Sequence, residues 1–97
     1  MFGEITIGKD TIIGENVKFY NYNHKYDNLD DKISNQGFNI GKINIGRNCW
    51  IALDVVILKD VVIGDNVVIG EGCIIYKSIP SNIVVKNNQS LIFSNKT

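Results

Sequence analysis

The 97-residue sequence is short of several features, and each shortage excludes a class of protein. Its longest apolar runs last only a few residues, so we expect no membrane-spanning helix. Ten basic and ten acidic residues give a formal net charge of zero, which argues against a nucleic-acid-binding protein, since such proteins have a strongly basic surface. The first residues lack the charged and apolar regions of a secretory signal, so we expect a cytoplasmic location.

Proline occurs once and helix-favouring residues are scarce, whereas isoleucine and valine dominate the apolar set. Residues that branch at Cβ favour strands over helices. Hydrophobic residues make up 44% of the chain, which is enough for a core, and the length suits one domain. We therefore predict a single all-β domain over residues 1–97.

From residue 45 onward the sequence repeats with a period of six residues. Each hexad opens with an isoleucine and carries a second compact residue four positions later. The opening residues are Ile45, Ile51, Ile57, Ile63, Ile69 and Ile75, and the second residues are Cys49, Val55, Val61, Val67, Cys73 and Ile79. Residues 7–19 repeat the pattern. A period of six does not fit an α-helix, and it predicts short parallel strands that wind into a three-sided coil of about 18 residues per turn.

In such a coil both compact positions face inward, and the residue between them lies in a turn. The turn positions carry Asp10, Asn16, Asn48, Asp54, Asp60, Asn66, Gly72 and Ser78. Asn, Asp and Gly tolerate the left-handed backbone best, so we expect that conformation here. Cys49 and Cys73 would face inward on different faces of the coil, so we expect two free thiols rather than a disulfide.

The repeats make only about three coils, so the predicted coil has open ends and little core. We expect its flat faces to pack against other copies, most simply as a homotrimer, with a monomer that has capped ends as the alternative. We predict that residues from about 81 to 97 form a C-terminal tail.

Residues 20–42 interrupt the repeat and form a long, polar loop. This loop carries the only histidine of the chain, His24. Histidine suits general-base chemistry near neutral pH, and a loop on a rigid scaffold is a common place for a functional side chain. The spacing alone leaves two interpretations of His24 open, a catalytic base or a surface histidine.

Three segments resemble a known family: Tyr22–Asp27, Ile33–Phe38 and Ile45–Ala52. They are similar to the left-handed β-helix O-acetyltransferases, above all to those that acetylate bacterial surface polysaccharides. The similarity continues to Pro80 and thus covers nearly the whole chain. The resemblance implies a left-handed parallel β-helix with one long protruding loop.

The resemblance also implies a reaction, the transfer of acetyl from acetyl-CoA to a hydroxyl group of a sugar or polysaccharide. By that resemblance, His24 is the general base, the backbone N–H of Leu53 stabilises the oxyanion and Trp50 forms a wall near the thioester. The acceptor is expected to contact Tyr22, Asn23 and Gln36.

The cofactor, which is the acetyl donor, would lie in a groove between two neighbouring subunits. The resemblance assigns acetyl-CoA binding to residues of two coils and of the tail. They are Ala52, Gly70, Glu71, Tyr76, Lys77 and Asn87. We predict no metal site, because a γ-type carbonic anhydrase with the same coil would need three histidines.

Other functions remain open at this stage. Val85–Gln89 retains only the asparagine of the family's Ala-Gly-Asn-Pro-Ala segment, which favours a non-catalytic trimeric β-helix that binds or assembles. Asn23, His24 and Trp50 favour an enzyme instead. Among enzymes, a serine O-acetyltransferase is a weaker alternative, since its helical N-terminal domain is absent from this sequence.

Overall fold

The computed structural model describes residues 4–96. Within them the regular elements are short strands and one 3₁₀ turn, η1 (Ile33–Asn35), and there is no α-helix. The strands are β1 (Ile5–Ile7), β2 (Ile12–Ile13), β3 (Lys18–Tyr20), β4 (Tyr22–His24), β5 (Phe38–Ile40), β6 (Ile43–Ile45), β7 (Trp50–Ile51), β8 (Val56–Leu58), β9 (Val62–Ile63), β10 (Val68–Ile69), β11 (Ile74–Ile75) and β12 (Val84–Val85). No helix in this part of the chain is long and apolar enough to cross a membrane.

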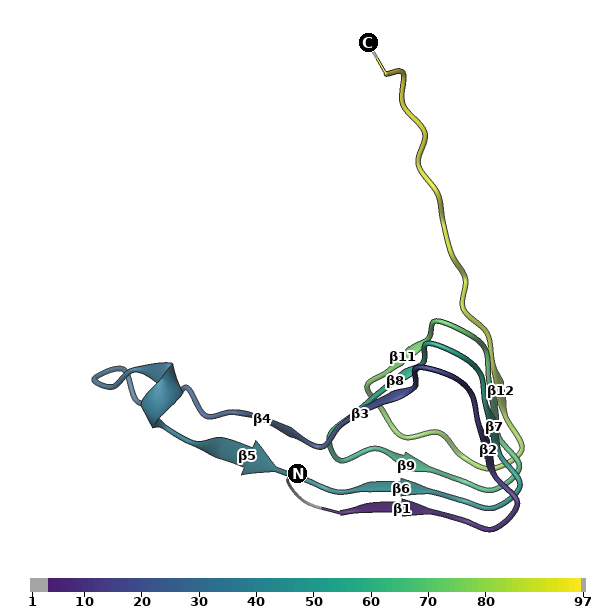
Figure 1. Cartoon of the computed structure of the whole chain (residues 1–97), viewed down its shortest axis with the longest axis horizontal. Helices are drawn as coiled ribbons and strands as arrows, with labels where there is room; N and C mark the ends of the chain where they lie inside the picture. The colour runs from purple at the N-terminus through teal and green to yellow at the C-terminus, as the bar shows by residue number, and fades with distance from the viewer. Residues whose placement is uncertain (1–3, 97) are drawn as a thin grey trace.

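Ten of the strands form the three faces of a prism (Figure 1). Face A contains β1, β6 and β9, face B contains β2, β7, β10 and β12, and face C contains β3, β8 and β11. All strand pairs within a face are parallel. Trp50 pairs with Val68 and Val56 pairs with Ile74, and in both cases the two residues are 18 positions apart in the sequence. The predicted three-sided parallel coil is therefore confirmed.

The inward positions predicted from the six-residue repeat form the core. Every one of them from Ile45 to Ile79 is buried. The core also includes Ile43, which lies two residues before Ile45 on β6 and so faces the same side. At the N-terminal end Ile7 is exposed, because β1 is an edge strand and no further coil of the described residues covers it. Parallel pairing in register therefore stacks apolar residues into rungs that hold the coils together.

The turns adopt the left-handed backbone expected of them. The φ angle is positive at Asp10, Asn16, Asn48, Asp54, Asp60, Asn66 and Gly72, as predicted, and also at Asn82. Three of these asparagines form a ladder along one corner. Asn48 Nδ2 donates to Asn66 Oδ1 at 3.2 Å, and Asn66 Nδ2 donates to Asn82 Oδ1 at 3.0 Å.

The last coil is shorter than the sequence repeat predicted. Ile79 aligns with Ile63, so it opens a new hexad instead of closing the previous one, and Ser78 lacks the positive φ angle expected of it. The Ser78 hydroxyl accepts a hydrogen bond from the Val62 N–H at 2.9 Å. Because β12 still pairs with β10, the coil continues to Val85, a few residues beyond the expected start of the tail.

The long loop is inserted at the corner between faces C and A. Paired residues are 38 positions apart before it (Tyr20 and Leu58) and 18 apart after it (Asn44 and Val62), so the insertion adds 20 residues to one coil. Within it, β4 and β5 pair antiparallel, and the resulting hairpin projects from the prism (Figure 1). At its base, Asn21 is buried and its backbone oxygen accepts the Gly41 N–H at 2.8 Å.

We expect Ile57→Ala to lower the free energy of unfolding by about 2–5 kcal/mol, because it removes most of a fully buried side chain from a middle rung. Val62→Ala, on the exposed side of face A, is the control and should cost far less. Urea denaturation at one protein concentration measures both. Equal losses in the two variants would contradict the proposed role of the rungs.

Asn66 tests the left-handed turns, since its φ angle is 56°. Asn66→Ala and Asn66→Gly both remove the two side-chain hydrogen bonds, but only alanine is strained at this φ angle. We expect the alanine variant to be the less stable by about 1 kcal/mol in urea denaturation. A glycine variant that is no more stable than the alanine variant would contradict this explanation.

Candidate functional site

A groove of about 410 Å³ runs along face B to the corner between faces B and C. The pairing of β7 with β10 sets Trp50 beside Val68 and places Ala52 one coil away from Gly70. The residues that line the groove are Gly14, Trp50, Ala52, Leu53, Val68, Ile69, Gly70 and Glu71. Five of the site residues predicted from the sequence thus meet in one groove.

Trp50 lies on the outer side of face B and 54% of its surface is exposed. Its register neighbours across the face are Ile12 and Val68, and Val84 follows in the next coil. Ile12 and Val84 are exposed as well. The groove is therefore bordered by an apolar stripe, which we call the face B stripe: Ile12, Trp50, Val68 and Val84.

The corner beside the groove has a free backbone donor. At the corner between faces A and B, the equivalent N–H groups of Arg47 and Asp65 donate to the Asp65 carboxylate and the Ser81 hydroxyl, both at 2.8 Å. At the corner between faces B and C, the Leu53 N–H makes no hydrogen bond with any of residues 4–96. This donor can therefore serve a ligand without breaking a bond of the fold.

Gly14 keeps this donor open, and the sequence analysis did not single it out. A Cβ atom at position 14 would lie 2.8 Å from the Leu53 nitrogen and 2.9 Å from the Ala52 carbonyl carbon. A larger residue would therefore displace this corner. The signal was present in the sequence, since Gly14 follows Ile13 as Ala52 follows Ile51.

The rim of the groove includes the start of the C-terminal segment. A Cβ atom at Gly70 would lie 3.2 Å from the Val85 oxygen, so a side chain at this position would make a tight contact with the next coil of the chain itself. Asn87 Nδ2 donates to the Glu71 backbone oxygen at 3.4 Å. Asn87 therefore lies at the groove, and the exposed Glu71 side chain gives the same rim a negative charge.

The structure places Tyr76 and Lys77 elsewhere. They follow β11 and line a hollow of about 300 Å³ at the C-terminal end of the coil, with Ile79, Pro80 and Ile83 among its other residues. The Lys77 ammonium lies 6.0 Å from the centre of the Tyr76 ring. Within one chain, these two residues do not join the groove on face B.

His24 lies on the projecting hairpin and is exposed. It pairs with Phe38 on β5, and the centres of the two rings are 4.8 Å apart. Tyr22 packs edge-on against Phe38, with the ring centres 5.4 Å apart. Phe38 thus joins two predicted site residues, although sequence analysis did not assign it to the site, because an antiparallel pair has no repeat to reveal it.

The two other predicted acceptor residues differ in their surroundings. Asn23 is exposed and pairs with Asn39 on β5. Gln36 is tied into the loop, because its Nε2 donates to the backbone oxygens of Asn28 and Asp31, both at 3.0 Å, and its Oε1 accepts the Asn28 N–H at 3.1 Å. The contacts of Gln36 therefore hold the tip of the hairpin in shape.

The hairpin and the groove lie on opposite sides of the prism. The hairpin leaves the corner between faces C and A, whereas the groove lies on face B, at the far side in Figure 1. A single chain therefore does not bring His24 to Trp50 and Leu53.

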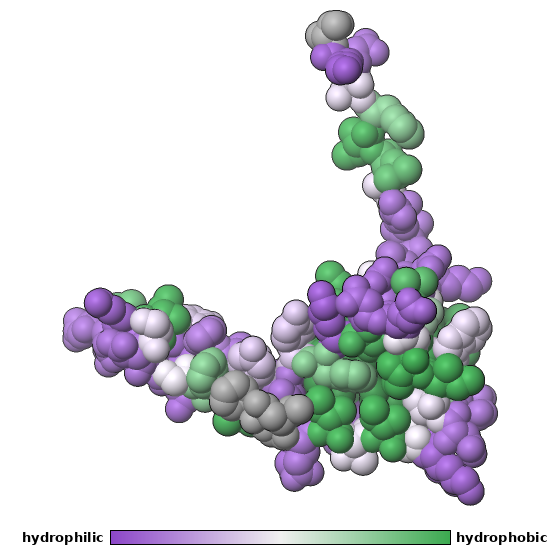
Figure 2. Space-filling model, in the orientation of Figure 1, coloured by the Kyte–Doolittle hydropathy of each residue, from purple (hydrophilic) through white to green (hydrophobic). Residues whose placement is uncertain are grey.

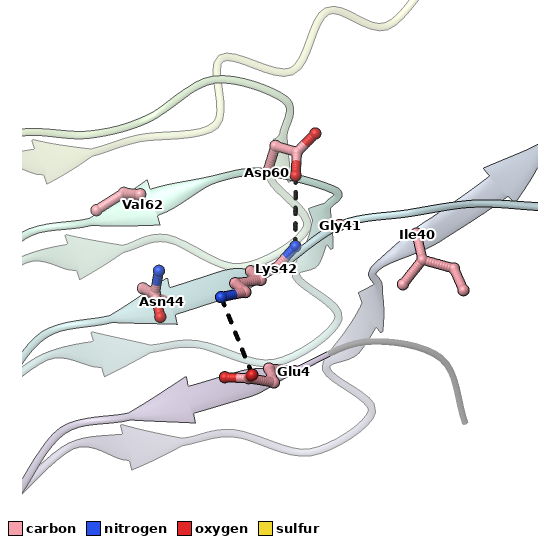
Figure 3. A pocket seen from close by; sticks show the side chains of 7 residues that line it. All are labelled: Glu4, Ile40, Gly41, Lys42, Asn44, Asp60 and Val62. Atoms are coloured by element: carbon pink, nitrogen blue, oxygen red, sulfur yellow. Dashed lines mark hydrogen bonds and ion pairs between the residues drawn. The ribbon is translucent and has the colours of Figure 1, made fainter.

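A second hollow, of about 490 Å³, lies at the base of the hairpin (Figure 3). The Lys42 N–H donates to the Asp60 carboxylate at 3.3 Å, and the Lys42 ammonium is 4.0 Å from the Glu4 carboxylate. A hydrogen bond from the Lys59 ammonium lowers the pKa of Asp60. These charges are exposed and paired with one another, and none of the predicted site residues lies here.

The two cysteines lie in the core of the coil. Both are buried and free, as predicted, and burial raises the pKa of the Cys73 thiol. Within residues 4–96, no three or more His, Cys, Asp or Glu side chains are grouped to hold a metal ion.

Together, the coil and its groove define a hexapeptide-repeat β-helix, and comparison with known proteins supports this class. Residues 42–77 match the family "Bacterial transferase hexapeptide (six repeats)". A Dictyostelium discoideum protein named "Putative acetyltransferase" is 43% identical over 89 residues, which are 91% of this chain and 45% of that protein. The "Putative colanic acid biosynthesis acetyltransferase WcaF" of Escherichia coli is 33% identical over 93% of this chain and 47% of its own length. The chain thus spans about half the length of the curated relatives it matches.

Solved structures show the same likeness. A galactoside acetyltransferase in complex with coenzyme A has a TM-score of 0.74 and 40% identity, over 82% of this chain and 39% of that chain. A hexapeptide-repeat acetyltransferase of Vibrio cholerae, in complex with acetyl-CoA, has a TM-score of 0.74 and 28% identity, over 82% and 43%. The chain resembles hexapeptide-repeat acetyltransferases, as its motifs indicated, and its coil is the left-handed β-helix of that class.

Proposed function

We propose that this protein transfers acetyl from acetyl-CoA to a hydroxyl group of a sugar or polysaccharide and acts as a cytoplasmic homotrimer. The observation that carries the proposal is the groove on face B, in which Trp50, Ala52 and Gly70 lie beside the free N–H of Leu53. The likeness to a galactoside acetyltransferase bound to coenzyme A and to a colanic acid acetyltransferase supports the donor and the acceptor class.

The groove suits the thin pantetheine arm of acetyl-CoA. Its walls are mainly aliphatic and aromatic, and its floor is backbone, because small residues stand at positions 14, 52 and 70. Amides of the arm can pair with backbone groups at such a floor. Lys77 and Tyr76 of a neighbouring copy would meet the nucleotide end, whose phosphates need a cation to balance Glu71.

In the proposed reaction, His24 accepts the proton of the acceptor hydroxyl as its oxygen attacks the thioester carbon. The new C–O bond produces a tetrahedral oxyanion, to which the Leu53 N–H donates. The C–S bond then breaks, and the thiolate of CoA takes the proton back from His24. Base catalysis of this kind contributes about 10²–10⁴-fold to the rate. Phe38 would hold the imidazole, since the rings are in contact.

The proposed site needs a second copy, because the hairpin and the groove of one chain are on opposite sides. Faces B and C both expose apolar side chains, the face B stripe on one and Ile74 and Tyr76 on the other. Packing about a threefold axis would cover these two faces and leave face A, which exposes Thr6 and Asn44 as well as Val62, in solvent. The hairpin of one copy could then reach the groove of the next.

The second candidate function is a non-catalytic β-helix that binds or assembles. The observation that favours it is the exposed carboxylate of Glu71 at the groove, which would repel the phosphates of CoA. A wild-type protein that shows no CoA binding by calorimetry at millimolar concentration would support this candidate and contradict acetyl transfer.

We expect His24→Gln to reduce acetyl transfer by about 10²–10⁴-fold, because glutamine cannot accept the proton. Release of free thiol from acetyl-CoA, with and without oligosaccharide acceptors, measures the rate. Lys25→Gln, next to it on the hairpin, is the control and should retain nearly the full rate. Equal rates for wild type and His24→Gln would show that His24 is not the general base.

Ala52→Leu tests the groove, because Ala52 lines it and a larger side chain would fill the space of the pantetheine arm. We expect CoA affinity, measured by calorimetry, to fall about tenfold or more, since the variant blocks apolar and backbone contacts. Val62→Leu adds bulk to the outside of face A and serves as the control. Unchanged affinity in Ala52→Leu would contradict CoA binding in this groove.

A further inference from the structure

The C-terminal segment, residues 86–96, leaves the coil after β12 and runs outward as an extended chain without regular structure (Figure 1). It carries three consecutive apolar residues, which we call the apolar triplet: Leu91, Ile92 and Phe93. They are 66%, 95% and 89% exposed. Figure 2 shows them as a separate hydrophobic cluster between hydrophilic stretches, away from the body.

An exposed cluster of this kind indicates a contact surface. Single apolar residues are common on protein surfaces, but contiguous ones are characteristic of binding sites. No hydrogen bond joins residues 88–96 to the coil, and Asn87 is the last residue of the described chain that makes one. The segment is thus extended and free to bury its triplet against another surface.

The position of the triplet limits where that surface lies. Asn87 is fixed at the rim of the groove by its hydrogen bond to Glu71. Leu91 follows four residues later, so the triplet begins within about 14 Å of the rim even when the chain is fully extended. Whatever covers the triplet must therefore lie beside the corner between faces B and C.

The exposed apolar faces favour a second copy of this chain as the partner, and the charges match such a contact. Residues 86–97 contain two lysines and no acidic residue, so with a net charge of zero overall the rest of the chain carries two negative charges. Glu15, Asp54 and Glu71 stand at the corner between faces B and C. The faces on either side of that corner expose the apolar side chains described above.

We infer that the apolar triplet docks on the exposed apolar faces of a second copy and fastens the copies together beside the groove. In a closed symmetric assembly, the C-terminal segment of each copy then binds one neighbouring copy, and each copy binds the segment of another. The contact would also fix Lys86 and Asn87 at the rim of the groove. The inference rests on the self-association in the proposed function and is independent of the acyl transfer.

We expect L91S/I92S/F93S to raise the dissociation constant of the assembly at least about tenfold, because the variant removes the apolar contact. Sedimentation equilibrium of the full chain over a range of concentrations measures this constant. The matched control N88S/Q89S/N95S changes three polar residues of the same segment and should associate like wild type. Because the triplet is exposed and is no part of the core of the coil, circular dichroism should show both variants folded.

A photo-crosslinker in place of Phe93 identifies the surface. In assemblies mixed from chains with natural and heavy isotopes, we expect crosslinked peptides that join a light chain to a heavy one. Crosslinks within single chains alone, which would mean that the segment folds back on its own coil, would overturn the inference. Equal association of wild type and the triplet variant would overturn it too, as would a wild type that stays monomeric. A wild type that assembles through the triplet without binding CoA would disprove acetyl transfer and leave this inference intact.

Discussion

The stacking of inward apolar residues in register is the constraint on which the rest of the structure depends. Each face offers only two or three residues per coil, so stability comes from repeating the same rung in successive coils. A shift of one residue would turn the rungs outward and expose the core. The period of 18 residues is therefore held along most of the chain, and variation is confined to the corners and the ends.

The same constraint explains what could be predicted from the sequence. The rungs and the left-handed turns follow from the period, and so does the neighbourhood of Ala52 and Gly70, which are one coil apart. The register predicted for Ile79 and Ser78 was wrong, because the last coil is two residues shorter than the 18-residue period. Nothing in the six-residue repeat indicates this shortening. The pairing of β4 with β5 could not be predicted either, because Phe38 and His24 are far apart in the sequence and meet only in the folded hairpin.

The three corners show why the groove lies where it does. Side chains accept hydrogen bonds from backbone N–H groups at two of them, Asp65 and Ser81 between faces A and B, and Asp60, which accepts from Lys42, between faces C and A. Between faces B and C, small residues stand next to the turn and the Leu53 N–H stays free. Because no bond of the fold uses the Leu53 N–H, this donor can pair with a ligand without breaking a contact among residues 4–96.

The rigid coil also explains why the proposed function places the site between two chains. The rungs fix the angle between the faces, so no bending of the coil can bring the hairpin round to face B. In the proposed function another copy supplies the second half of the site, and the surfaces proposed for that contact are the exposed apolar faces and the apolar triplet. Assembly and acetyl transfer would then depend on the same contacts, because the residues that join the copies border the groove that the hairpin must reach. In such an arrangement a weakened interface lowers the rate even when His24 and Leu53 are intact.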